Sequence, residues 1–201
     1  MILAVDVGGT KIATGVVDPE SCRVYGYSRR PVRAEGNELI AQLNEAIEET
    51  STFAKSRELA CTRIGIGLAE IVTADGRVTS QQTFDVGERE IYESLQTELP
   101  VTVSSDVRCA ALAEGRAGSA KGRDLFFYVS LGTGLSSCLV VDGKPIVGAH
   151  GSAIVLGSGS IPLAPHANAD RHFCLEAFSS GKGIAERYFK ERGVPVEGAY
   201  E

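Results

Sequence analysis

The chain has 201 residues, of which 43% are hydrophobic and 23% charged, and its formal net charge is −6. This composition predicts a soluble globular protein of one large or two small domains, and the acidic balance disfavours nucleic acid as a partner. No apolar stretch approaches the roughly 20 residues that cross a bilayer, and the N-terminus lacks the charged region and cleavage site of a signal peptide. Five widely spaced cysteines form no CxxC pair, so we expect free thiols in a cytoplasmic protein.

The first part of the chain alternates predicted strands and helices. The expected elements are strands at Ile2–Val7, Ile12–Asp18 and Arg23–Arg30, a helix at Asn37–Lys55, a strand at Arg63–Leu68, a helix at Gly87–Leu99, a strand at Val101–Ser104 and a helix at Asp106–Gly118. Apolar residues recur at helical spacing in the first helix, and Pro100 ends the second. This order of elements is typical of an α/β fold.

A glycine turn joins the first two strands and carries a distinctive set of polar groups. Gly8 and Gly9 allow backbone N–H groups to approach an anion, because no Cβ stands in the way. Thr10 adds a hydroxyl and Lys11 a positive charge, while Asp6 can hold Mg²⁺ through the waters of the ion. The turn therefore suits a nucleoside triphosphate with its metal. A plain glycine turn beside a structural aspartate is the alternative interpretation.

The same pattern returns in the second part of the chain. The expected elements there are strands at Leu125–Leu131 and Leu135–Val141 joined by Gly132-Thr133-Gly134, an Asp142-Gly143 turn, a strand at Lys144–Val147 and one helix at Leu175–Arg192. The unit of strand, glycine turn, strand, turn and strand thus occurs twice, which indicates an internal duplication. Fewer elements follow the second copy, so we expect its unit to be incomplete.

Four stretches of the chain carry distinctive motifs, and they are Asp6-Val-Gly-Gly-Thr-Lys-Ile12, Ser105-Asp-Val-Arg-Cys-Ala-Ala-Leu-Ala-Glu114, Leu131-Gly-Thr-Gly-Leu135 and Cys174-Leu-Glu-Ala-Phe-Ser-Ser-Gly181. Together they resemble the ROK family (repressors, open reading frames, kinases) of bacterial sugar kinases. The resemblance covers essentially the whole chain and implies a duplicated ribonuclease H-like fold, as in actin-like ATPases, with the second unit incomplete. We expect a first domain over residues 1–118, with the first phosphate loop and the catalytic aspartate, and a partial second domain over residues 119–201.

The resemblance implies phosphorylation of a sugar hydroxyl by ATP, as in glucokinases and related hexose or amino-sugar kinases. Asp106 would be the general base, held ionised by the positive end of its helix, although a plain helix cap would look the same. The other implied site residues are Asp6 for Mg²⁺ through water, Asp6, Gly8, Gly9, Thr10, Lys11, Gly132, Thr133 and Gly134 for ATP, and Ser105, Asp106 and Glu176 for the sugar. The glycines could also be tight strand connections, and Glu176 a solvated charge. A homodimer is a further expectation from the family.

Several positions depart from the family pattern on the sugar side. Ser105 replaces an asparagine, Ala69-Glu70 replaces Pro-Gly, and Gln81-Gln82-Thr83 stands where a second sugar-binding asparagine is expected. Val155 and Ser158 replace the family's glutamate and histidine.

The zinc ligands of the family are also mostly replaced. Cys174 remains, but Ala167 and Ala169 occupy the other two cysteine positions. Tetrahedral zinc needs four ligands, so we expect no zinc, and a makeshift site with His166, His172 and Cys174 is the weaker alternative.

Three functions compete on this basis. The first is an ATP-dependent sugar kinase, or a fragment of a longer one, since the Gly-rich adenosine site of the family is not found. The second is a non-catalytic ROK relative that binds phosphate or sugar. The third, a transcription repressor, is disfavoured because it needs a helix–turn–helix before the first strand and Met1 leaves no room for one.

Overall fold

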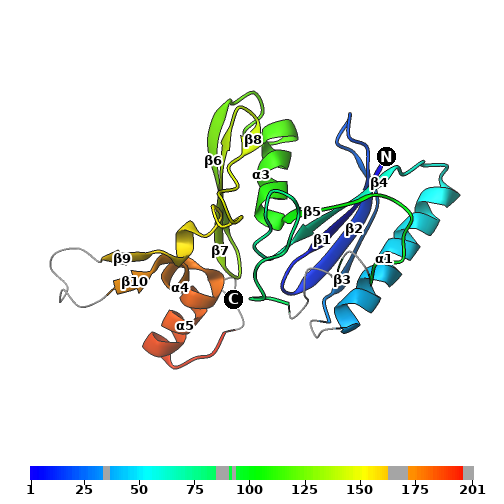
Figure 1. Cartoon of the computed structure of the whole chain (residues 1–201). Helices are drawn as coiled ribbons and strands as arrows, with labels where there is room; N and C mark the ends of the chain where they lie inside the picture. The colour runs from blue at the N-terminus through cyan, green and yellow to red at the C-terminus, as the bar shows by residue number, and fades with distance from the viewer. Residues whose placement is uncertain (34–36, 85–90, 92–93, 163–171, 197–201) are drawn as a thin grey trace. The chain divides into compact units, whose positions relative to one another are not determined.

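Figure 1 presents a computed structural model of the chain, which describes residues 1–33, 37–84, 91, 94–162 and 172–196. The chain divides into two compact units. One unit contains Met1–Gly122 and Val147–Ser152, and the other contains Arg123–Ile146 and Ala153–Glu201. Among the described residues, no helix is long and apolar enough to cross a membrane.

The first unit is built on a mixed sheet of five strands. Its elements are β1 (Ile2–Val7), β2 (Lys11–Val17), β3 (Val24–Pro31), α1 (Asn37–Ser56), β4 (Arg63–Leu68), β5 (Val101–Ser105) and α3 (Asp106–Ala117). The strand order is β3-β2-β1-β4-β5. The first three strands form an antiparallel meander, whereas β4 and β5 add to β1 in parallel. The glycine turn joins β1 to β2, as predicted.

The two faces of this sheet carry different side chains, because strand residues alternate between faces. On one face, Leu3, Val5 and Val7 of β1 are 0–2% exposed and form the core with apolar residues of α1. On the other face, β4 presents Arg63, Gly65 and Gly67, and the two glycines leave room for α3. Figure 1 shows α1 and α3 on opposite sides of the sheet.

The second unit repeats the opening of the first. Its elements are β6 (Leu125–Leu131), β7 (Leu135–Val141), β8 (Lys144–Pro145), the 3-10 helix η1 (Leu156–Ser158), β9 (Ser160–Pro162), β10 (His172–Cys174), α4 (Leu175–Ser179) and α5 (Gly181–Arg192). Strands β6, β7 and β8 form an antiparallel sheet in that order, and β9 pairs with β10. The predicted Asp142-Gly143 turn is confirmed, since both residues have a positive φ, 49° and 71°.

The helix predicted over Leu175–Arg192 is wrong as a single helix. The chain breaks at Ser180, whose φ of −67° and ψ of 161° are extended. The Ser180 side chain accepts a hydrogen bond from the Gly183 N–H at 3.1 Å and so caps the start of α5. The capping bond explains why a serine followed by glycine starts a new helix here.

Two other predicted elements differ from the structure at their C-terminal ends. Strand β8 stops at Pro145, although the Ile146 N–H still donates to the Leu139 carbonyl of β7 at 2.8 Å. The helix predicted at Gly87–Leu99 lies mostly outside the described residues, and Leu95–Leu99 is not helical. There the Gln96 N–H donates to Asn44 Oδ1 at 2.7 Å instead of to a helical carbonyl.

Candidate functional site

The carboxyl ends of β1, β4 and β5 lie at one edge of the first sheet, because these strands run parallel. The first glycine turn follows β1, Glu70 comes shortly after β4, and Asp106 follows β5 directly. Open α/β sheets bind their ligands at this edge. The topology therefore brings three of the polar segments of the first unit to one place.

Asp6 and Asp106 both lie close to Gly67 of β4. A Cβ placed on Gly67 would lie 3.5 Å from the Asp106 Cα and 3.6 Å from Asp6 Oδ1. The Cys109 Sγ, one turn further along α3, would also lie 3.6 Å away. A longer side chain at position 67 would fill the space between these groups. The glycine thus allows the start of α3 to come close to β1.

Both carboxyl groups have a pKa above the ordinary value for aspartate. Burial raises the pKa of Asp106 most, and the negative charges of Asp6 and Glu70 raise it further. The Val107 N–H donates to Asp106 Oδ1 at 2.7 Å and opposes this rise by stabilising the carboxylate. Burial also raises the pKa of Asp6. A carboxylate with a raised pKa is a better proton acceptor, so Asp106 is suited to take a proton from a nearby hydroxyl.

The first glycine turn is closed by backbone hydrogen bonds. The Gly8 N–H donates to the Lys11 carbonyl at 2.9 Å, and the Val32 N–H donates to the Thr10 carbonyl at 3.0 Å. The side chains of Thr10 and Lys11 are exposed. They are therefore available to a ligand, together with the backbone of the turn.

Sequence reasoning assigned no role to Glu70, which the structure places at the centre of a neighbouring loop. Its carboxylate is 5% exposed and accepts hydrogen bonds from the backbone N–H groups of Gln82, Thr83 and Phe84 and from the Ser80 hydroxyl. The available sequence signal for this role was a glutamate shortly after a buried strand. The hydrogen-bond partners of Glu70 lie too far along the chain for sequence spacing to reveal them.

Ser105 lies inside the first unit. It pairs with Leu68 in the sheet register and is fully buried. Its hydroxyl has no hydrogen-bond partner among the described residues, and it does not cap α3. A sugar contact by Ser105 stays a prediction.

The second glycine turn lies beside the start of α4 within the second unit. The Gly132 N–H donates to the Gly134 carbonyl at 3.0 Å, and the Gly132 carbonyl accepts from the Gly181 N–H at 2.8 Å. A Cβ on Gly134 would lie 3.5 Å from Glu176 Oε1. The structure therefore places Glu176 next to a glycine turn, with Thr133 exposed between the two glycines.

The segment expected to carry zinc ligands is only partly described. The Cys174 Sγ lies 3.4 Å from the Gly157 carbonyl, which it contacts as a donor. His166, Ala167 and Ala169 lie outside the described residues. In the part of the chain that the structure describes, no three His, Cys, Asp or Glu side chains gather as metal ligands.

Comparison with known proteins identifies the family. The family model described as ROK family matches residues 2–198. The chain belongs to the ROK family. The resemblance inferred from four motifs is thus confirmed.

Named ROK relatives are sugar kinases with different sugars. The glucokinase of Streptomyces coelicolor is 28% identical over 196 residues, which cover 96% of this chain and 60% of that protein. The N-acetylgalactosamine kinase AgaK of Shewanella sp. is 29% identical over 200 residues, covering 94% of this chain and 63% of that protein. The chain therefore spans less than two thirds of the length of these relatives.

A solved ROK structure has the same fold. It is the ROK family glucokinase from Streptomyces griseus in complex with glucose and AMPPNP, with a TM-score of 0.77 and 28% identity. The match covers 96% of this chain and 61% of that chain. The predicted duplicated ribonuclease H-like, actin-like ATPase fold is confirmed.

Proposed function

We propose that this chain is the sugar-phosphorylating part of an ATP-dependent ROK kinase, with Asp106 as its general base. The observation that carries the proposal is the position of Asp106. It stands at the start of α3, beside Asp6 and at the carboxyl edge of the sheet, with a raised pKa. The sugar is of the hexose or amino-sugar class that the named relatives phosphorylate.

In the proposed reaction, Asp106 accepts the proton of a sugar hydroxyl while the hydroxyl oxygen forms a bond to the γ-phosphorus of ATP. The bond from that phosphorus to the β–γ bridging oxygen breaks, and ADP leaves with its electron pair. Backbone N–H groups at Gly9 and Thr10 and the Lys11 ammonium bind phosphate oxygens in this proposal. For the second unit, we propose phosphate contacts by Gly132, Thr133 and Gly134.

Magnesium fits the residues at this edge. Asp6 stands at the carboxyl end of β1 and stays accessible to solvent, although it is buried enough to raise the pKa of its carboxyl group. In phosphoryl-transfer sites Mg²⁺ is held by one or two carboxylates together with substrate phosphates. Asp6 would hold the ion through its waters. When bound, the ion would neutralise charge that develops on the phosphates.

The proposal is tested by measuring ADP release with Mg-ATP and a panel of glucose, N-acetylgalactosamine and N-acetylmannosamine. The assay uses the 201-residue chain and also the product of the complete reading frame, where that frame extends past Glu201. Asp106→Asn should lower kcat by about 10²–10⁴-fold. Asp75→Asn, at the tip of an exposed hairpin, is the matched control and should leave kcat unchanged.

Stability separates loss of catalysis from loss of folding. Because the folded-state pKa of Asp106 is raised, its ionised form destabilises the fold at neutral pH, and stability increases as pH falls through that pKa. Asp106→Asn removes the charge and should unfold at the same temperature as the wild type or higher. A variant that still turns over at the wild-type rate contradicts the assignment, whatever its unfolding temperature.

A non-catalytic role is the second candidate. The replacements Val155 and Ser158 favour it, because one removes a carboxylate and the other exchanges an imidazole for a short hydroxyl where the family has sugar ligands. In that case calorimetry would detect binding of Mg-ATP or of a sugar from the panel. ADP release would then stay at background for every sugar.

A further inference from the structure

We propose that Glu70 is a positioning residue that holds the loop Gln82–Phe84 as one wall of the sugar site, beside Asp106. This inference rests on the proposed kinase function. It concerns a position where the chain departs from the family pattern, and it assigns a role to a buried carboxylate outside the phosphate-binding turns.

The first step is the set of hydrogen bonds around the Glu70 carboxylate. Glu70 Oε1 accepts from the Thr83 N–H at 2.6 Å and from the Phe84 N–H at 2.9 Å. Glu70 Oε2 accepts from the Gln82 N–H at 3.1 Å and from the Ser80 hydroxyl. Three consecutive backbone N–H groups converge on one anion, which is the geometry of an anion-binding nest. Here the anion is supplied by the chain itself.

The second step is the burial of this carboxylate. Glu70 is 5% exposed, and the side chain of Phe84, at the end of the loop, is 2% exposed in the core. A buried carboxylate costs free energy unless hydrogen bonds stabilise it; the loop provides three such bonds and the Ser80 hydroxyl a fourth. The loop and the carboxylate therefore depend on each other, and the loop has one preferred conformation.

The third step is the connection of this loop to the phosphate-binding turn. The Thr83 hydroxyl donates to the Ala69 carbonyl at 2.9 Å, and the Thr83 Cγ2 would lie 3.2 Å from a Cβ on Gly9. The Ala69 N–H in turn donates to the Val7 carbonyl at 2.9 Å. Glu70 thus fixes a loop that lies against the first glycine turn.

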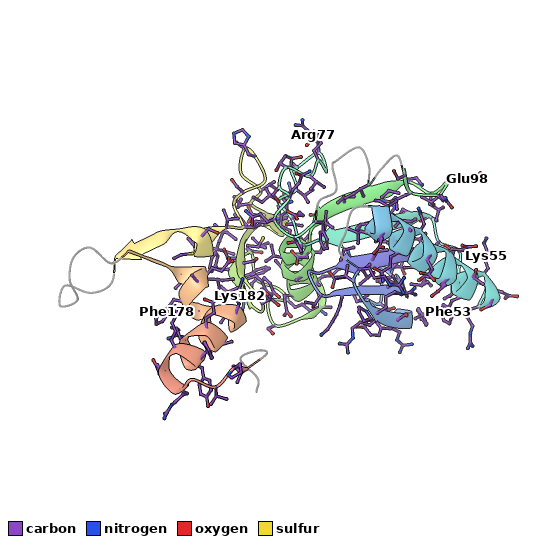
Figure 2. The ribbon with its side chains drawn as sticks, turned by 90° about the horizontal axis from the view of Figure 1, so that it is seen from below. Phe53, Lys55, Arg77, Glu98, Phe178 and Lys182 are labelled. Carbon is purple, nitrogen blue, oxygen red and sulfur yellow. The ribbon has the colours of Figure 1, made fainter. Side chains whose placement is uncertain are left out.

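The fourth step connects the loop to the helix that carries Asp106. Between Glu70 and the loop, the chain forms a hairpin in which Val72 pairs with Val78, and Figure 2 labels Arg77 near its tip. The buried Arg108 of α3 donates from Nη2 to the Val72 carbonyl. The charge of Glu70 also contributes to the raised pKa of Asp106. The proposal places the sugar hydroxyl that reaches Asp106 beside this loop, which presents the exposed Gln82 side chain.

The experiment compares Glu70→Gln and Glu70→Asp with Asp75→Asn. Glutamine keeps the shape but exchanges one acceptor oxygen for a donor, and aspartate keeps the charge but shortens the reach. The carboxylate of Asp75 lies on the same hairpin, where it accepts from Arg77 Nε at 2.9 Å, and is exposed. It therefore controls for general effects of removing a hydrogen-bonded carboxylate.

The first readout is amide hydrogen exchange at residues 82–84 in the ligand-free protein. Glu70→Gln should speed exchange there by at least about tenfold, because the N–H groups lose acceptors. Asp75→Asn should leave it unchanged. Unchanged exchange in both Glu70 variants, with thermal unfolding showing that they are folded, overturns the proposal.

The second readout is the division between KM and kcat for the sugar that the wild type phosphorylates. Both Glu70 variants should raise the sugar KM about tenfold while kcat changes by less than about threefold. An equal rise with Glu70→Asp shows that position rather than charge is responsible. A sugar KM equal to that of the wild type overturns the proposal even if exchange is faster. If the wild type neither binds nor phosphorylates any sugar of the panel, the kinase function fails and the sugar role of Glu70 fails with it, whereas the exchange result still decides whether Glu70 holds the loop.

Discussion

The two units open in the same way but differ in how their first strand is used. In the first unit, β1 is central, with β2 on one side and β4 on the other. In the second unit, β6 is an edge strand that pairs only with β7 among the described residues. The same sequence of strand, glycine turn and strand thus forms a central strand in the first unit and an edge strand in the second.

The exposure of side chains follows this difference. Leu3, Val5 and Val7 of β1 are 0–2% exposed beneath α1. Alternate residues of β6 are 45–65% exposed, and they are Leu125, Phe127, Val129 and Leu131. Alternation along a strand determines which residues share a face, but only packing by other elements determines whether that face is buried. An apolar face of this kind marks a contact surface or a face that further chain covers.

Matched leucines in the two units give the largest expected difference. Leu3→Ala should destabilise the protein by about 2–5 kcal/mol, since it removes a fully buried side chain from the core. Leu131→Ala should cost less than about 0.5 kcal/mol, because Leu131 is 60% exposed. Urea unfolding of both variants measures the two costs. A large cost for Leu131→Ala would mean that the open face of β6 is covered in solution.

Two serines that precede helices offer a smaller contrast. The Ser180 side chain accepts from the Gly183 N–H, so Ser180→Ala should cost about 1 kcal/mol. Ser105 precedes α3 without such a bond, and its buried hydroxyl has no partner among the described residues. Ser105→Ala should therefore be neutral or stabilising, because it removes an unpaired polar group. Thermal unfolding measures both, and equal losses would show that Ser105 also has a partner in solution.

Most of the strands were predictable from sequence because their signals are local. The limits of β1, β4, β6 and β7 follow from short apolar runs between glycines and polar residues. The break at Ser180 was not predicted, since apolar and polar residues continue at helical spacing across it. It depends on one side-chain cap, which competes with the helix only in the folded geometry.

The candidate site was predictable only in part. Asp6 and Asp106 could be found because each stands next to a glycine turn or a helix start within a recognisable motif. Glu70 could not be assigned, since its partners Gln82, Thr83 and Phe84 lie 12–14 positions away. Contacts at that separation depend on how a hairpin folds back. No spacing rule for strands or helices encodes them.

The smallest expected effect concerns the residue before each glycine turn. Asp6 and Ser130 occupy corresponding positions, each two residues before the first glycine of its turn. Asp6→Ser makes the first turn resemble the second and removes a negative charge that raises the pKa of Asp106. Ionisation of Asp106 then becomes easier, so its pKa should fall. The carboxyl ¹³C resonance of Asp106, followed by NMR during a pH titration, measures the pKa without requiring activity.

Asp18→Asn is the matched control for this shift. Asp18 follows the far end of β2, where its carboxylate accepts from the Glu20 N–H at 3.0 Å, and it is not among the groups that raise the pKa of Asp106. The control should leave the Asp106 titration in place. An unchanged pKa in Asp6→Ser would mean that the charge of Asp6 does not contribute to the proton affinity of Asp106. The Asp6 carboxylate would then differ from the Ser130 hydroxyl only in its ability to hold a metal. The two glycine turns would in that case differ less in function than their sequences indicate.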